Sequence, residues 1–305
     1  MTRKKEKCCD SIVFFLLVTV LFPSVCFALE KPVEVDIPFQ GQDLEAETIV
    51  FGFNLCRSLK EDIQKYVPFL KYLSTATGYK FRLRFIQKDA SIADDLGRGV
   101  IQLAAVCAGT YILANEKYGV VPLARGVSSQ GKSECQAVIV VAPDSPMQTI
   151  EDVRGKRLVF GSKTSTQGHL IPLIIFARHN ISLDDFVSYE WTGSSHNCAE
   201  AVASGEADVC GMQDELGKEL AREGFVRILF ASSYYPSSGI VAGKNFDSVK
   251  FEKIKKALIE FEPGGAHAQG LYHWDKTAMP NGFVEAKDED YQELREWSRK
   301  LGLLE

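Results

Sequence analysis

The sequence lacks the short motifs that commonly mark metal, redox and hydrolytic sites. The cysteines after residue 28 form no CxxC pair, and no segment reads GxSxG. Zinc and thioredoxin-like sites usually carry the first motif, and the nucleophile of α/β-hydrolases lies in the second. Ser195, His196 and Asp208 have the residue types of a hydrolase triad, but adjacent Ser and His at one helix start rarely point at each other. The sequence therefore predicts no metal, no cofactor and no catalytic residue.

Long apolar runs are also scarce, and the one that stands out lies at the start of the chain, from Ser11 to Phe22. It follows a basic start and precedes the small-residue ending Cys26-Phe27-Ala28, so we interpret residues 1–28 as a cleaved export signal and expect a periplasmic protein. A retained membrane anchor is disfavoured, because the run is shorter than the roughly 20 residues that span a bilayer. A lipoprotein anchor at Cys26 is a less favoured alternative, since Pro23 stands where a Leu is usual.

Positive charge is in short supply as well. The formal net charge is −5, and removal of residues 1–28 takes away four basic and two acidic side chains, which leaves −7. An acidic protein is a poor partner for nucleic acid or for an anionic membrane surface. An anionic ligand would need a locally positive site, which helix N-termini supply without basic side chains.

An odd number of cysteines follows residue 28: Cys56, Cys107, Cys135, Cys198 and Cys210. At least one thiol is therefore free in an exported protein. Cys198 and Cys210 flank one predicted helix and could form a disulfide, but two buried thiols in neighbouring elements fit the spacing equally well. The pairing stays open at this point.

Strands and helices alternate along the chain in two series, which predicts an α/β protein with two open sheets. The first series has strands at 48–55, 79–86 and 102–107, with helices at 59–77, 91–98 and 110–118. After a strand at 136–142, the second has strands at 157–160, 187–191, 207–212 and 226–231. Helices at 251–261 and 288–301 are expected to complete the first lobe. We therefore predict a discontinuous lobe 1 (29–140 and 233–305) and a lobe 2 (141–232), with the ligand between them.

Residues 157–172, RLVFGSKTSTQGHLIP, form the segment around which the predicted binding site is organised. A short strand leads into a loop with hydroxyls at Ser162, Thr164, Ser165 and Thr166. Gly168 permits close backbone approach, and a helix follows from about 167 with Pro172 in its first turns. Unpaired N–H groups at this helix start would face an anion held by the hydroxyls. An ordinary Ser/Thr helix cap is the alternative for this loop taken alone.

Two more loops follow strands and have a suitable composition. Residues 192–197, which include Ser195 and His196, lead into a second helix start, and residues 107–111, which include Thr110 and Tyr111, lie in the first lobe. In open α/β sheets the ligand lies beyond the carboxyl ends of the strands. We therefore expect all three loops to face one cleft.

Together these segments resemble the periplasmic phosphate/phosphite/phosphonate-binding proteins of ABC transporters, a family with the type II periplasmic-binding fold. The resemblance is carried by DSPMQTIEDVRGKRLVFG, STQGHLIP, SSHNCAEAVASGEADVCGM and AGTYILANEKYG. In this family the second segment is the anion loop and the last is a first-lobe helix that carries a Tyr.

The resemblance implies a ligand-binding role for nine residues: Ser165, Thr166, Gln167, Gly168, His169, Ser195, His196, Thr110 and Tyr111. The hydroxyls of Ser165 and Thr166, backbone N–H groups near Gln167 and the ring of His196 would donate to phosphoryl-type oxygens. Gln167 replaces a third hydroxyl of the family's loop, and a Tyr often found after the second strand is missing around 89–91. Structural alternatives are a capping role for His196, packing for His169 and a place in the core for Tyr111.

The resemblance implies a solute-binding protein that captures phosphate, phosphite or an alkylphosphonate for an ABC permease of the inner membrane. We expect a monomer whose lobes close on the ligand. A ligand-sensing subunit for a membrane receptor is the alternative, and an enzyme on the same fold is a less favoured one. Residues 234–239, expected over the far end of the ligand, have hydroxyls and no acid, and the nearby acids Asp214 and Glu215 follow a different strand. A ligand without an ammonium group is therefore expected, because an enclosed ammonium needs a carboxylate partner.

Overall fold

The computed structural model describes residues 32–39, 47–54, 59–86 and 91–304, which belong to one compact unit that begins at Pro32. The predicted signal peptide at residues 1–28, Cys56, and Asp89 and Ala90 lie outside the described residues.

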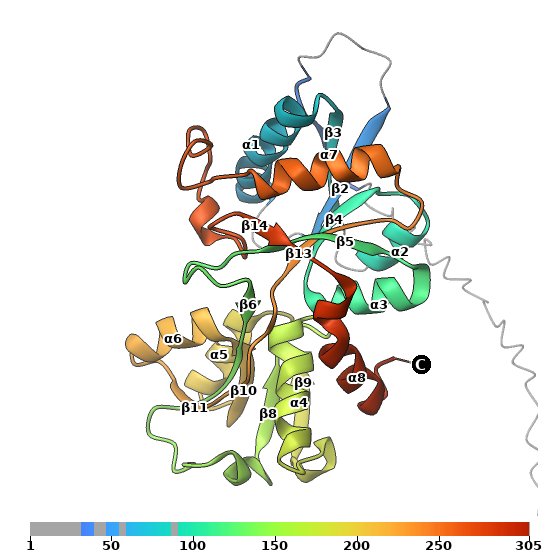
Figure 1. Ribbon diagram of the computed structural model, residues 1–305. Coiled ribbons are helices and arrows are strands. Elements are labelled where there is room, and N and C mark those ends of the chain that lie inside the picture. The colour runs from blue at the N-terminus through green and yellow to red at the C-terminus, as the bar shows by residue number, and fades with distance from the viewer. Residues whose placement is uncertain (1–31, 40–46, 55–58, 87–90, 305) are drawn as a thin grey trace, which may run out of the picture. The chain divides into compact units, whose positions relative to one another are not determined.

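A seven-stranded mixed sheet forms the first layer of the fold (Figure 1). Its strands, in spatial order, are β1 (Glu34–Asp36), β3 (Lys80–Ile86), β2 (Thr48–Asn54), β4 (Leu103–Val106), β13 (Gly239–Ala242), β5 (Val121–Gly126) and β14 (Phe283–Glu285). β2 runs parallel to β3 and β4, as the predicted alternation requires, and β13 returns antiparallel between β4 and β5.

Helices α1 (Leu59–Thr77) and α7 (Ser248–Ile259) pack together against this sheet, and α2 (Ile92–Gly97) and α3 (Ala108–Tyr118) form a second pair. In α1 the apolar residues Tyr66, Phe69, Leu70 and Leu73 recur at helical spacing and are buried. Helix α3 ends at Gly119, whose φ of 70° is the left-handed conformation that glycine adopts at little cost. The aromatic side chains of α1 are buried against the sheet. Helix α3 begins at Ala108, directly after the carboxyl end of β4.

A five-stranded mixed sheet forms the second layer. Its strands, in spatial order, are β11 (Arg227–Ala231), β7 (Ala137–Val141), β10 (Val209–Gln213), β8 (Arg157–Phe160) and β9 (Ser188–Trp191). Val138 and Val140 of β7 pack with α5 (Ser195–Ala203), whereas Ile139 and Val141 join the cluster on the face of α4 (Ile171–Arg178). Side chains of a strand alternate between faces, so this strand is buried on both. Helix α6 (Asp214–Arg222) packs on β11 and β10. The remaining short helices are η1 (Ile150–Val153), η2 (Thr166–Leu170), η3 (Leu183–Asp185), η4 (Trp274–Lys276) and η5 (Asp288–Tyr291).

Two antiparallel strands connect the sheets. β6 (Glu134–Cys135) leads from β5 to β7, β12 (Tyr235–Pro236) leads from β11 to β13, and the two pair with each other. β7 lies inside the five-stranded sheet, antiparallel to β10 and β11, so the chain crosses between the sheets before Ala137. The predicted lobe boundary after residue 140 falls inside β7. The lobe boundaries themselves stay a prediction.

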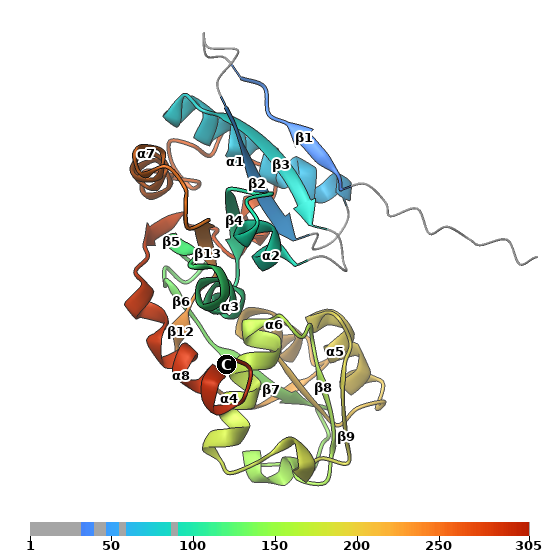
Figure 2. The ribbon, with the colours of Figure 1, turned by 90° about the vertical axis from the view of Figure 1, so that its right-hand side faces the viewer.

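Helix α8 (Gln292–Lys300) contacts α3, which follows a strand of the seven-stranded sheet, and α4, which follows a strand of the five-stranded sheet (Figure 2). Arg295 binds Asn115 and Glu116 of α3, and Arg178 of α4 forms an ion pair with Glu293 of α8. The buried residues Tyr291 and Leu294 belong to one apolar cluster with side chains from α3 and α4. The chain segment predicted to complete the first lobe thus also packs against the second sheet's helix.

A disulfide between Cys198 of α5 and Cys210 of β10 answers the question that the spacing left open. The two Cα atoms are 5.8 Å apart, and both side chains are fully buried. Among the described residues, Cys107 and Cys135 are free.

Candidate anion-binding site

The loop between β8 and η2 has the geometry of a helix start. Ser165 has an extended backbone, and its hydroxyl oxygen accepts a hydrogen bond from the Gly168 N–H at 2.9 Å. The turn is a single π-helical turn, Thr166–Leu170, which leads directly into α4 with Pro172 near its start. A Cβ on Gly211 of β10 would lie 2.5 Å from the Pro172 ring, so glycine at that position lets the helix start approach the sheet.

Thr166 joins this helix start to the start of α3. Its buried hydroxyl oxygen accepts a hydrogen bond from the backbone N–H of Gly109 at 2.7 Å. Beside it, the Cys107 thiol donates to the carbonyl oxygen of Thr164 at 3.1 Å. Two helix N-termini therefore converge on the hydroxyl loop. One is the start of α3, which follows β4, and the other is the start of η2 and α4, which follow β8. The positive ends of two helix dipoles favour an anion there.

Thr110 and Tyr111, the other predicted residues of α3, are placed differently from each other. Thr110 lies in the first turn, with its hydroxyl 3.3 Å from the Cys107 sulfur. Tyr111 is 1% exposed, its ring packs on Tyr291, and its hydroxyl donates to Asp288 at 2.5 Å. Burial and the adjacent Asp288 carboxylate raise the pKa of Tyr111. A ligand contact by Tyr111 would require that bond to Asp288 to be exchanged.

His169 is a buried residue that binds the backbone of the loop. Its Nδ1 lies 2.8 Å from the Lys163 carbonyl oxygen, and its ring meets Phe160 and Trp191 edge to face. Burial lowers the pKa of His169, so the ring is neutral at pH 7 and donates its Nδ1 proton to that carbonyl. The Lys163 ammonium lies over the Trp191 ring. The arrangement holds the backbone of the loop in place.

The second predicted helix start, at α5, is capped by a neighbour of the predicted residues. Ser194 accepts a hydrogen bond from the Asn197 N–H at 3.1 Å, and Ser195 is the first residue of the helix. His196 is exposed and lines the large cleft described next. Ser195 does not line that cleft, although its hydroxyl approaches Gly161 of the anion loop.

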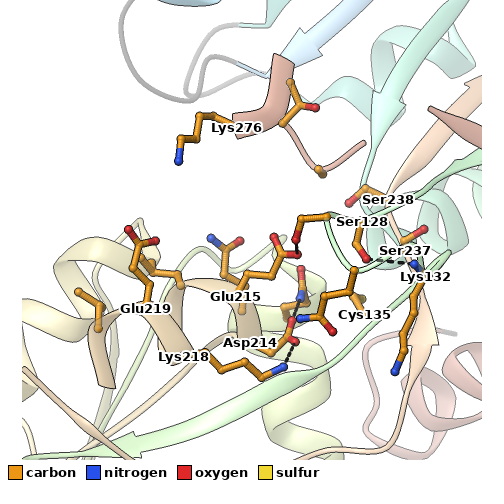
Figure 3. A pocket seen from close by; sticks show the side chains of 18 of the residues that line it. Ser128, Lys132, Cys135, Asp214, Glu215, Lys218, Glu219, Ser237, Ser238 and Lys276 are labelled. Atoms are coloured by element: carbon orange, nitrogen blue, oxygen red, sulfur yellow. Dashed lines mark hydrogen bonds and ion pairs between the residues drawn. The ribbon is translucent and has the colours of Figure 1, made fainter. Parts of the chain in front are cut away.

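A cleft of about 1310 Å³ opens beside the hydroxyl loop, and Gln167 and His196 are the predicted site residues that line it. Figure 3 shows side chains from the chain segment before β6, from α6 and from the loop at η4 around this space. Acidic side chains outnumber basic ones: the acids are Glu61, Glu134, Asp214, Glu215, Glu219, Glu223 and Asp275, and the bases are Lys132, Lys218, Arg222 and Lys276. A bound oxyanion would therefore depend on N–H groups and hydroxyls more than on basic side chains.

Gln167 connects the loop to this cleft. Its amide nitrogen donates to the Gln136 carbonyl oxygen at 2.7 Å and lies 3.4 Å from a carboxylate oxygen of Asp214. Asp214 in turn binds the Lys218 ammonium at 2.7 Å. The sequence interpretation considered Asp214 but missed Lys218, although an acid and a lysine four residues apart on a helix are expected to pair.

Residues 51–291 match the family described as "ABC transporter, phosphonate, periplasmic substrate-binding protein". The chain belongs to this family. The phosphonate-binding family consists of substrate-binding proteins, so the prediction of binding without catalysis is confirmed, as is the prediction of a periplasmic component of an ABC importer.

Individual relatives of this chain are distant in sequence. The phosphonates-binding periplasmic protein of Escherichia coli (strain K12) is 26% identical over 236 residues, which are 73% of this chain and 69% of the relative. A probable ABC transporter phosphite binding protein of Prochlorococcus marinus (strain MIT 9301) is 22% identical over 301 residues, 92% of this chain and 93% of the relative. The structure of PhnD1 from the same organism, in complex with methylphosphonate, superimposes with a TM-score of 0.72 at 15% identity and covers 84% of this chain and 98% of that one. This likeness confirms the predicted type II periplasmic-binding fold.

Two features are absent from the part of the chain that the structure describes. None of the helices there has the length and apolar character to cross a membrane. No group of three or more His, Cys, Asp or Glu side chains in that part of the chain is arranged to hold a metal ion.

Proposed function

We propose that this protein captures a small phosphorus oxyanion without an ammonium group, namely phosphate, phosphite or an alkylphosphonate, and delivers it to an ABC permease of the inner membrane. The proposal includes export through residues 1–28 and action as a monomer. The names of the two curated relatives, one phosphonate-binding and one phosphite-binding, support the ligand class.

The hydrogen bond from the Gly109 N–H to the Thr166 hydroxyl carries the proposal. It brings the start of α3 and the loop before α4 to one point, where the Ser165 hydroxyl also accepts an N–H. A hydroxyl that accepts one hydrogen bond still has its own proton to donate. Ser165 and Thr166 are therefore oriented by the N–H groups that they accept, and their O–H groups are available to an oxyanion.

A thermal-shift panel tests the proposed function directly. Purified protein without residues 1–28 is heated with phosphate, phosphite, methylphosphonate, 2-aminoethylphosphonate or sulfate. A ligand at a hundred times its dissociation constant stabilises by about 2.7 kcal/mol, which for a chain of this size raises the Tm by about 5 °C.

We expect stabilisation by at least one of the first three compounds, a smaller effect of 2-aminoethylphosphonate, and none with sulfate. Stabilisation by 2-aminoethylphosphonate alone would contradict the proposed tail chemistry. Silence across all phosphorus compounds would contradict the ligand class for this chain.

A further inference from the structure

Asp214 is the buried charged side chain among the described residues that line the cleft. It is 6% exposed, whereas the other acidic cleft residues are half-buried or exposed to water. It begins α6, where the positive end of the helix dipole also favours a carboxylate. A buried carboxylate interacts with a charged ligand far more strongly than an exposed one does, because water and salt screen a buried charge less effectively.

Asp214 lies next to the predicted anion loop. The amide of Gln167, two residues after Ser165, reaches one carboxylate oxygen at 3.4 Å. A ligand whose phosphorus group sits on the loop would therefore extend its substituent past Gln167 toward Asp214. That is where an ammonium group on a short tail would find its counter-ion.

Lys218 already occupies this position. Its ammonium lies 2.7 Å from the other carboxylate oxygen of Asp214, and the two residues are four apart on α6 (Figure 3). Glu215, the second acid at this strand end, accepts a hydrogen bond from Ser129 at 2.6 Å. Lys218 is 39% exposed, so its amino group keeps contact with water while it neutralises a buried charge.

We propose that Lys218 determines whether the site accepts a ligand with a positively charged tail. Its ammonium pairs with Asp214, so the carboxylate is not available as the counter-ion that an aminoalkylphosphonate needs, and it also repels the ammonium group of such a ligand. The inference rests on the proposed function, and it assigns to Lys218 the preference for a tail without positive charge. The Asp214–Lys218 pair has no net charge, so the surface that faces the far end of the ligand is electrically neutral. Lys218 is a specificity-determining residue that has no bond to the phosphorus group.

The test is the ratio of affinities for 2-aminoethylphosphonate and methylphosphonate, measured by calorimetry. Lys218→Met keeps most of the side-chain volume and releases the charge of Asp214. The ratio should move toward 2-aminoethylphosphonate by about 10- to 150-fold, the range expected for a hydrogen-bonded pair with a charged partner. Lys218→Gln retains a donor to Asp214 and should move the ratio in the same direction, which keeps the test valid if the Met variant folds poorly.

Two further variants isolate the cause. Asp214→Asn combined with Lys218→Met removes both charges and should cancel the gain. Lys276→Met removes one positive charge from the opposite side of the cleft and should leave the ratio unchanged, because Lys276 forms no hydrogen bond or ion pair with Asp214 or Gln167. A parallel loss of both ligands in Lys218→Met would overturn the inference, since Lys218 would then contact the phosphorus group. An unchanged ratio would overturn it as well, while methylphosphonate binding by the unaltered protein would leave the proposed function intact.

Discussion

Replacement of Thr166 by Val separates binding by the loop from its structural role. The change preserves the branched shape of the side chain and removes the hydroxyl, which in the structure accepts the Gly109 N–H at 2.7 Å. Two free energies should change. A lost hydrogen bond to a charged oxyanion costs about 1.5–3 kcal/mol, so the affinity for methylphosphonate should fall by about 10- to 150-fold.

The free energy of unfolding should also fall, because the Gly109 N–H loses its partner at a site where Thr166 is 3% exposed. An unsatisfied buried donor costs about 1–3 kcal/mol. Calorimetry at 25 °C gives the affinity of the folded protein, and urea unfolding gives the stability, so the two effects are measured independently. With Ser165→Ala added, the second hydroxyl is lost too, and binding should weaken at least about a hundredfold.

Thr77→Val is the matched control. The Thr77 hydroxyl is buried in α1 and donates to the Leu73 carbonyl oxygen at 2.6 Å, so its loss should destabilise the fold without touching the loop. The reasoning is refuted if Thr166→Val lowers the stability as Thr77→Val does but binds methylphosphonate within about threefold of the unaltered protein. The Thr166 hydroxyl would then serve only as a helix cap.

Three other outcomes are expected. Cys210→Ser opens a loop of 12 residues and should lower the free energy of unfolding by about 3 kcal/mol, with the methylphosphonate affinity unchanged; a loss of binding instead would tie the disulfide to the site. Burial lowers the pKa of His169, so the unfolded chain takes up the proton first, and stability is complete above about pH 6.5 and declines below it; His169→Asn should show a weaker decline between pH 7.5 and 5, and identical pH profiles would refute this. Saturating ligand should reduce the radius of gyration in small-angle scattering by closure about the β6–β12 pair, and an unchanged radius would count against a hinge there.

Local patterns predicted local structure well. The helix expected at 59–77 is α1, Leu59–Thr77, and the strand expected at 157–160 is β8, Arg157–Phe160, because apolar periodicity and turn residues set such boundaries within the segment itself. The sequence pattern did not predict β5, whose residues VPLARG include Pro and Gly and alternate poorly. The predicted lobe boundary after residue 140 also falls inside β7, Ala137–Val141. A single apolar strand does not reveal its partners, and β7 is inserted antiparallel between two strands that come much later in the chain.

The site was predictable where it depends on neighbouring residues and not where it depends on distant ones. The cap formed by Ser165 follows from a hydroxyl three residues before Gly168. The direction of Tyr111 does not, because its partner Asp288 lies 177 residues away in the sequence. The Asp214–Lys218 pair was readable from its spacing, but its contact with Gln167 required the fold to bring α6 beside the loop.

The apolar cluster that contains Tyr291 and Leu294 has a thermodynamic consequence. It includes Ala104 of β4 in the seven-stranded sheet and Ile139 of β7 in the five-stranded sheet, so neither sheet can lose its packing without exposing side chains of the other. The free energy needed to open either sheet alone should then approach the free energy of global unfolding. Heat should therefore unfold the described part of the chain in a single cooperative transition. A destabilising change in α8, whose residues do not line the cleft, would consequently lower the melting temperature of both sheets together.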